Sequence, residues 1–253
     1  MSQDHSGGRV IKVYGPGDLT PGASIPVTVG LGGAAAPQAG DIIPATPGTN
    51  GSVTIIWNES VLYNAVGTFT FIVPNYTSLT VSVAGASGGG GGGDGKNSGT
   101  GLINLGTDGN NASGNTTFQS FANLVAQPGA GGIHSSGSGV LPSNGFSTNG
   151  VSGAASGGTA NVSGGGSKPG KGGSDWNGVY GGFGGVGGWT TKTFAHGDLS
   201  PGVGIVVKVA QGGAGGLGGG GSLPGNPGDA GANGYVNITW SGSGVHAFGV
   251  FMG

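Results

Sequence analysis

The apolar residues of this chain recur at every second position. Phe69, Phe71 and Val73 share one face of an alternating run, and residues 79–83 and 205–209 follow the same rule. A period of two is the repeat of a β-strand, whereas a helix shows a period of 3.6. Frequent glycine would also cost a helix about 1 kcal/mol per position. We therefore expect an all-β chain of short antiparallel strands with no α-helix.

Turn residues separate these runs. The sequence Pro-Asn-Tyr-Thr-Ser at residues 74–78 predicts a hairpin-like connection between two strands. Pro21–Gly22 and Pro201–Gly202 place proline and glycine at the central positions of a type II turn. Proline presets φ there, and glycine accepts the positive φ that follows.

A three-residue period runs through the glycine-rich part of the chain. Glycine occurs at 178, 181, 184 and 187, and again at 213, 216, 219, 225, 228, 231 and 234, with Ser222 as the break. Three residues per turn is the repeat of the polyproline II helix. We expect stacked polyglycine helices of this type, flanked by strands. A flexible Gly/Ser linker is the second interpretation, and a collagen-like triple helix is the third.

One segment of the sequence occurs twice. Residues 12–34 contain Lys-Val-Tyr, Gly-Asp-Leu-Thr-Pro-Gly, Ile-Pro-Val-Thr-Val and Gly-Gly-Ala, and residues 192–214 contain the matching succession. Each copy closes on one more strand, which ends at Trp57 or at Trp240. Only the second copy follows a long glycine-rich body. The first is therefore expected to be a half-module that another chain completes.

These features predict four parts along the chain. Residues 1–57 are the N-terminal half-module for assembly or attachment, and residues 58–65 are a linker. Residues 66–240 are the complete glycine-rich domain, and residues 241–253 are an apolar docking tail.

Composition excludes several classes of partner. Glycine supplies 67 of 253 residues, charged residues only 6%, and the net charge is −2. No basic stripe is present to neutralise phosphates, so neither nucleic acid nor an anionic membrane is an expected partner. Cysteine is absent, which removes disulfides and thiolate metal sites. The polar N-terminal stretch does not resemble a Sec-type signal peptide, and no apolar run has the length of a membrane span.

Side chains that could support catalysis are few and scattered. Asp18 and Asp198 occupy matched positions in the repeat, which favours a role in turns. The histidines show no metal-ligand spacing, and the candidate calcium ligands match no known loop and are interpreted as solvated turn residues. We expect a non-enzymatic protein with no metal or cofactor. The histidines are His5, His134, His196 and His246, and the candidate calcium ligands are Asp94, Asn97, Asp108 and Asn110.

The order of elements between residues 66 and 240 resembles a known family. A strand ending in Val73–Pro74 is followed by a strand that enters the glycine block at 85–93. Then come Pro-Gly, a Val-alternating strand, Gly-Gly-Ala and the closing Gly-Tyr-Val-Asn-Ile-Thr-Trp. This succession is similar to the glycine-rich domain of tailed-bacteriophage tail fibres and adhesins. The resemblance implies an extracellular, often trimeric domain that presents loops between polyglycine helices to a bacterial surface receptor.

Two groups of residues are candidates for contact with partners. Polar loops and clustered aromatic side chains favour receptor contact, and the alternative role of the aromatic rings is to cap the rims of the glycine bundle or a subunit interface. Apolar strand and terminal residues favour assembly. The receptor-binding candidates are Asn110, Asn111, His134, Asn144, Phe146, Trp176, Tyr180, Phe183 and Trp189. The assembly candidates are Ile25, Val27, Val29, Trp57, Phe248 and Phe251.

Two functions fit these expectations. The first is a tail-fibre or tail-tip adhesin that binds a host cell-surface protein or glycan. The second is a structural, decoration or fibre-forming protein of the virion, whose glycine module mediates assembly with other virion proteins. Both place the protein on an extracellular virion as a homo-oligomer, with a trimer implied by the resemblance, after synthesis in the host cytoplasm.

Overall fold

The computed structural model describes residues 28, 30–31, 51, 55–135 and 148–244. The chain divides into two compact units, Met1–Ile56 with Ser243–Gly253, and Trp57–Gly242. The second unit holds nearly all of the described residues. It contains strands and no helix, which confirms the all-β expectation for this part of the chain.

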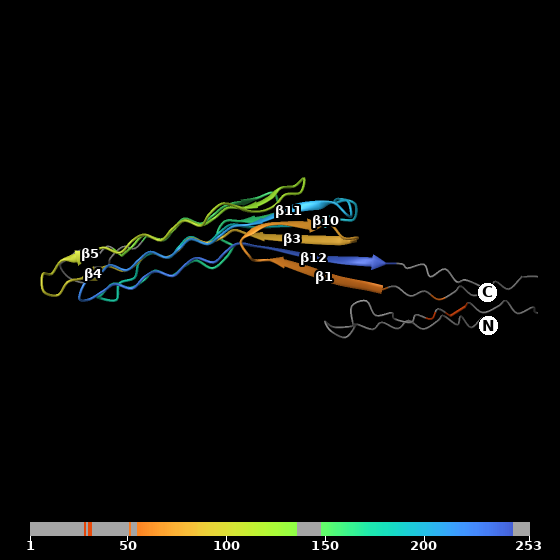
Figure 1. The fold of residues 1–253 in the computed structure, drawn as a ribbon. Coiled ribbons are helices and arrows are strands. Elements are labelled where there is room, and N and C mark those ends of the chain that lie inside the picture. The colour runs from red at the N-terminus through yellow and green to blue at the C-terminus, as the bar shows by residue number, and fades with distance from the viewer. Residues whose placement is uncertain (1–27, 29, 32–50, 52–54, 136–147, 245–253) are drawn as a thin grey trace, which may run out of the picture. The chain divides into compact units, whose positions relative to one another are not determined.

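Two five-stranded sheets make up most of the strand content (Figure 1). Strand order in the first sheet is β1-β12-β3-β10-β9, and in the second sheet it is β2-β11-β6-β7-β8. A separate two-stranded sheet pairs β4 with β5. The strands are β1 (Ile55–Tyr63), β2 (Gly67–Ile72), β3 (Ser78–Ala84), β4 (Gly95–Lys96), β5 (Ile103–Asn104), β6 (Thr116–Phe118), β7 (Leu124–Ala126), β8 (Ala155–Ser156), β9 (Ala160–Val162), β10 (Trp189–Ala195), β11 (Gly204–Val209) and β12 (Tyr235–Gly244).

The two large sheets enclose one hydrophobic core. Alternate residues of β3 and β11 are buried, as the period of two predicts. Phe118 of the second sheet lies 6.1 Å from Phe194 of the first, measured between ring centroids, and 6.2 Å from Phe71. Leu79 of the first sheet is fully buried in the same cluster. The aromatic rings thus join the two layers of a sandwich.

Two predicted connections are wrong. Residues 74–78 do not form a hairpin, because β2 pairs with β11 in one sheet and β3 pairs with β10 and β12 in the other. The segment crosses between the layers, and the buried Tyr76 accepts the N–H of Leu199 at its hydroxyl, at 2.7 Å. The predicted linker at 58–65 lies mostly in β1, which pairs with β12. The polar residues of β1 made this stretch resemble a linker. A strand of a sandwich can carry such residues because one of its faces lies in solvent.

The turn of the second repeat copy is as predicted. Gly202 has φ +82°, and the N–H of Val203 lies 3.3 Å from the carbonyl oxygen of Ser200. Asp198 accepts the N–H of Ala195 at 2.8 Å, which is the turn role expected for it. The first copy, including Asp18 and Pro21–Gly22, lies outside the described residues except for Thr28, Gly30, Leu31, Gly51 and residues 55–57, which begin β1.

The glycine body is a set of extended segments that belong to no strand, and residues 85–93 form its centre. Their N–H groups donate in rotation to three antiparallel neighbours, and their carbonyl groups accept in rotation from three parallel neighbours. Gly88 donates to Gly185 at 3.0 Å, and three residues later Gly91 donates to Gly182 at 2.9 Å. The six neighbouring segments are residues 106–112, 127–135, 166–174, 181–188, 212–219 and 225–232.

The neighbours also bond to one another and close a ring around the centre. The N–H of Asn110 donates to Ala214, and that of Gly182 donates to Ile133, at 2.8 and 2.7 Å. Residues 148–154 lie outside this ring, where Ala130 donates to Val151 at 2.9 Å. Residues 85–93 are consequently buried along their whole length although they carry almost no side chains.

Glycine is required here because a side chain would have no space. A Cβ built on Gly91 would collide with the carbonyl group of Ile133, and one built on Gly184 would collide with that of Gly88. Neither glycine has a positive φ. The requirement is therefore the absence of Cβ and not conformational freedom.

Each neighbouring segment repeats its exposure every three residues, with one exposed position in three in segment 212–219 and two in three in segments 106–112 and 225–232. Gly213, Gly216 and Gly219 are buried against the centre, whereas Leu217 is 69% exposed. Phe183 takes the outward position in its own segment. This arrangement accounts for the large apolar residues that interrupt the glycine period.

Alanine at Gly184 should strongly destabilise the protein, because its Cβ would meet backbone that cannot move without breaking hydrogen bonds. We expect a loss of about 3 kcal/mol, the upper part of the range for overpacking, read as a lower Tm in thermal unfolding. Gly220→Ala is the matched control, since a Cβ there meets nothing within 4 Å. Equal Tm values for the two variants would contradict this account of the body.

Candidate functional site

The end of the glycine body farthest from the large sheets, here called the tip, gathers three loops. It comprises residues 95–104, 174–180 and 220–224, and β4 and β5 mark it in Figure 1. Lys96 and Leu223 exchange backbone hydrogen bonds of 2.8 and 2.9 Å, which join the first loop to the third. The hydroxyl groups of Ser98 and Ser222 lie 2.8 Å apart beside them.

The second loop is a turn built around a buried aspartate. Asp175 accepts the N–H groups of Asn177 and Val179 at Oδ1, at 2.8 and 2.7 Å. Gly178 supplies a φ of +81°. The turn presents the half-buried Trp176 to the first loop, where the Nζ atom of Lys96 lies 4.4 Å from the ring centroid. A cation at this distance is attracted by the ring face.

Large apolar side chains are exposed around this Trp-Lys pair. Leu102 is 65% exposed and Tyr180 is 62% exposed, and Leu105 and Leu223 are exposed as well. Exposed apolar residues gathered with an aromatic ring and a cation are typical of a surface that binds another molecule.

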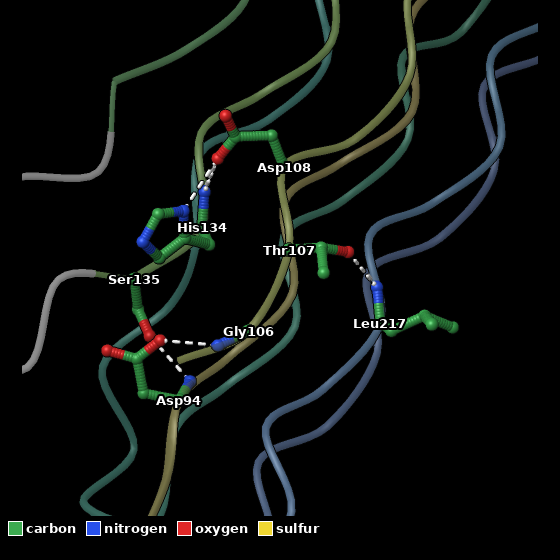
Figure 2. A network of polar contacts seen from close by, with 7 residues as sticks. All are labelled: Asp94, Gly106, Thr107, Asp108, His134, Ser135 and Leu217. Atoms are coloured by element: carbon green, nitrogen blue, oxygen red, sulfur yellow. Dashed lines mark hydrogen bonds and ion pairs between the residues drawn. The ribbon is translucent and has the colours of Figure 1, made fainter. Parts of the chain in front are cut away.

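A polar network anchors the tip to the glycine body (Figure 2). The buried Asp94 accepts the N–H of Gly106 at Oδ1, at 2.8 Å, and its own N–H donates to the hydroxyl of Ser135 at 2.9 Å. The hydroxyl of Thr107 accepts the N–H of Leu217 at 2.7 Å. Side chains thus take over from carbonyl groups where the glycine period ends.

A hydrogen-bonded aspartate–histidine pair extends the same network. Asp108 Oδ1 lies 2.6 Å from Nδ1 of His134 and 2.9 Å from its backbone nitrogen. These two hydrogen bonds, the backbone one first, hold the pKa of the Asp108 carboxyl below its usual value. Both side chains are partly exposed, so the pair ties two neighbouring segments together without forming a closed pocket.

The structure separates the predicted receptor-binding residues into several places. Trp176 and Tyr180 lie at the tip, Phe183 lies along the body, and Trp189 is the first residue of β10 in the sandwich. Asn110 and Asn111 are not in a tip loop but in a body segment, where their side chains are exposed. His134 is held by Asp108, and Asn144 and Phe146 lie outside the described residues.

The assembly candidates are mostly untested by the structure. Ile25, Val27, Val29, Phe248 and Phe251 lie outside the described residues, and Trp57 lies in β1.

Lys96, Leu102 and Leu223 are tip residues that sequence reasoning missed. One signal could have indicated them: Ser222 breaks the glycine period, and such a break marks the point where a body segment turns.

No cluster of three or more His, Asp or Glu side chains suited to a metal ion occurs within the described part of the chain. The same residues include no helix with the length and apolarity of a membrane span. No protein family, curated protein or solved structure matches the chain.

Replacing Asp108 by Asn should reduce the stability of the protein at neutral pH and leave it unchanged in strong acid. The folded-state pKa of Asp108 is lowered. Its stabilisation is therefore present above the unfolded value of about 3.9 and is lost as the pH falls through the folded value. The pair is exposed, so we expect a difference below about 1 kcal/mol.

Thermal unfolding at several pH values between about 2 and 7 checks this expectation, with Asp229→Asn on a neighbouring segment as the control. A difference between wild type and Asp108→Asn that does not depend on pH would contradict the charge-based explanation.

Proposed function

We propose that this protein is a non-enzymatic receptor-binding protein of a tailed-phage virion, and that its tip contacts the host surface. The observation that carries the proposal is the tip itself. Exposed leucine and tyrosine side chains belong to the same three loops as the Trp176–Lys96 pair, at the end of a hydrogen-bonded body. Rigid aromatic anchors with polar neighbours supply contact area at low entropic cost.

We also propose that the segments of the glycine body are polyglycine helices of the polyproline II type. Within every three residues, the central segment donates to each of three antiparallel neighbours and accepts from each of three parallel neighbours. This repeat supports the conformation. So does the burial of every third residue in segment 212–219. At about 3.1 Å per residue, the central segment would hold the tip roughly 28 Å from the sandwich.

A structural role in the virion is the second candidate. Among the described strands, β2 pairs on one side only, and this edge with the exposed apolar residues beside it favours assembly with another chain. An assembly role and a receptor-binding role use different ends of the second unit, so one protein can combine them.

Purified protein should block adsorption of the particle to host cells. Removing the tip side chains in Trp176→Ala with Leu102→Ser should weaken binding to cells by at least about tenfold, equal to 1.4 kcal/mol. Leu217→Ser is the matched control, because it removes an equally exposed leucine from the body. Equal loss in both variants would place the contact along the body, and unimpaired binding by the tip variant would refute the proposed site.

Hydrogen exchange tests the proposed helices. The amides of residues 88–93 should exchange as slowly as those of β3, because each one donates within a ring of six segments. Uniformly fast exchange across residues 164–188 would contradict an ordered glycine body and favour the flexible linker.

A further inference from the structure

The second sheet ends at β2, which pairs with β11 on one side and with none of the described strands on the other. Thr70 lies opposite Val206 of β11, and the carbonyl group of Val206 accepts the N–H of Gln119, on the side of β6. Backbone groups of successive residues in an antiparallel strand point to opposite sides. The N–H and carbonyl groups of Thr68, Thr70 and Ile72 therefore point away from β11, toward the open side.

This edge carries none of the features that usually prevent strand addition. β2 reads Gly-Thr-Phe-Thr-Phe-Ile, without a charged residue or proline. Natural sheets protect their edges with lysine, proline or bulges. Ile72 is 58% exposed, and Leu62 and Val66, which precede β2 in the chain, are exposed as well. Unpaired backbone groups beside exposed apolar side chains are suited to accept a further strand.

The strand that fits this edge has to be apolar on the core side only. Directly opposite residues of antiparallel strands share one face of the sheet. The core side of β2 carries Phe69 and Phe71, whereas Thr68 and Thr70 are exposed. A second copy of β2 supplies the same alternation. The other described strands at sheet ends do not, because β1 contains Glu59, β8 has only two residues and every residue of β9 is exposed.

One register of β2 against a second β2 uses every outward backbone group. When Thr70 lies opposite Thr70 of the other copy, Thr68 lies opposite Ile72, and each N–H meets a carbonyl group. Phe69 then lies opposite Phe71 on the core side, and no like charges meet because the strand has none. A shift by one residue would set phenylalanine against threonine. A shift by two would leave one outward residue of each strand unpaired.

We propose that two copies of this chain pair through β2, antiparallel and around a two-fold axis at Thr70. The second sheets of both copies then form one continuous sheet. The contact is isologous, because each copy contributes the same surface, and it closes after two copies. It specifies the assembly role proposed above, on which it rests, and is independent of receptor binding. The result is a dimer in place of the trimer that the family resemblance implies.

This pairing points the two glycine bodies in opposite directions. β11 ends at Val209, opposite Gly67, and the chain then enters body segment 212–219. The body therefore lies beyond the Gly67 end of β2. Antiparallel pairing sets the Gly67 end of one copy beside the Ile72 end of the other, so the two tips reach opposite sides of the dimer.

A single introduced cysteine tests the pairing without background, because the chain has no cysteine of its own. Residues of a hydrogen-bonded antiparallel pair have Cα atoms about 5.5 Å apart, inside the range of about 4.4–6.8 Å that a disulfide spans. Thr70→Cys should therefore form a disulfide-linked dimer with itself under mild oxidation. Thr159→Cys, exposed between β8 and β9 at the opposite ends of the two sheets, is the control and should stay single.

Neighbouring positions test the register. Ile72→Cys alone should not link, since Ile72 of the other copy lies four residues from the position opposite it, roughly 14 Å away. Thr68→Cys and Ile72→Cys, one of them isotopically labelled, are mixed and allowed to exchange subunits. They should form a disulfide between one chain of each kind, identified by mass spectrometry. Absence of linking at Thr70→Cys, or equal linking at Thr70, Ile72 and Thr159, would overturn the proposal.

A second measurement does not depend on disulfide geometry. We expect light scattering to give the mass of two chains for the wild type and half that mass for Thr70→Lys, in which like charges would lie opposite each other. Thr159→Lys is the matched control and should remain a dimer, with the sheet signal in circular dichroism retained in both variants.

The outcomes separate two failures. A wild type that consists of single chains would refute the assembly role itself. An oligomer that Thr70→Lys leaves intact, or one of three chains, would overturn the pairing through β2 and leave assembly through another surface.

Discussion

The second unit depends on direct contact between backbones. In the glycine body, N–H and carbonyl groups of neighbouring segments bond across a space that no side chain could occupy. Most folds are stabilised by burial of apolar side chains, and backbone hydrogen bonds form because buried N–H and carbonyl groups need partners. In the glycine body the interior consists of hydrogen-bonded backbone groups. These hydrogen bonds have to offset the large conformational entropy that glycine loses on ordering.

The two ends of the body supply what glycine cannot. A lattice of identical glycines would bond equally well after a shift of three residues along any segment, so its register needs other groups. At the sandwich end, the hydroxyl of Ser87 donates to the carbonyl group of Ser167, and the hydroxyl of Ser167 donates to Asn233. At the tip, Asp94 and the Asp108–His134 pair have the same effect. Both ends therefore specify one alignment, and the loops of the tip are positioned by it.

Sequence patterns predicted the local elements better than their arrangement. The strands at 69–73, 79–83 and 205–209 follow from alternation, because one face of each strand is buried in a common core. The hairpin at 74–78 was wrong, because alternation does not indicate which sheet a strand joins. The segment around Asn110 was interpreted as a loop, because only one residue in three of an outer segment needs to be small. The contact of Lys96 with Trp176 could not be predicted, since the body brings together residues far apart in the sequence.

The scarcity of apolar side chains in the body affects how stability varies with temperature. Exposure of apolar surface on unfolding raises the heat capacity, whereas exposure of polar backbone lowers it. Residues 85–93 are fully enclosed, yet what they bury is mainly amide groups. Their share of the heat-capacity change per residue is therefore smaller than that of the sandwich. A flatter dependence of stability on temperature follows for this half of the unit, so cooling weakens it less than it weakens a hydrophobic core.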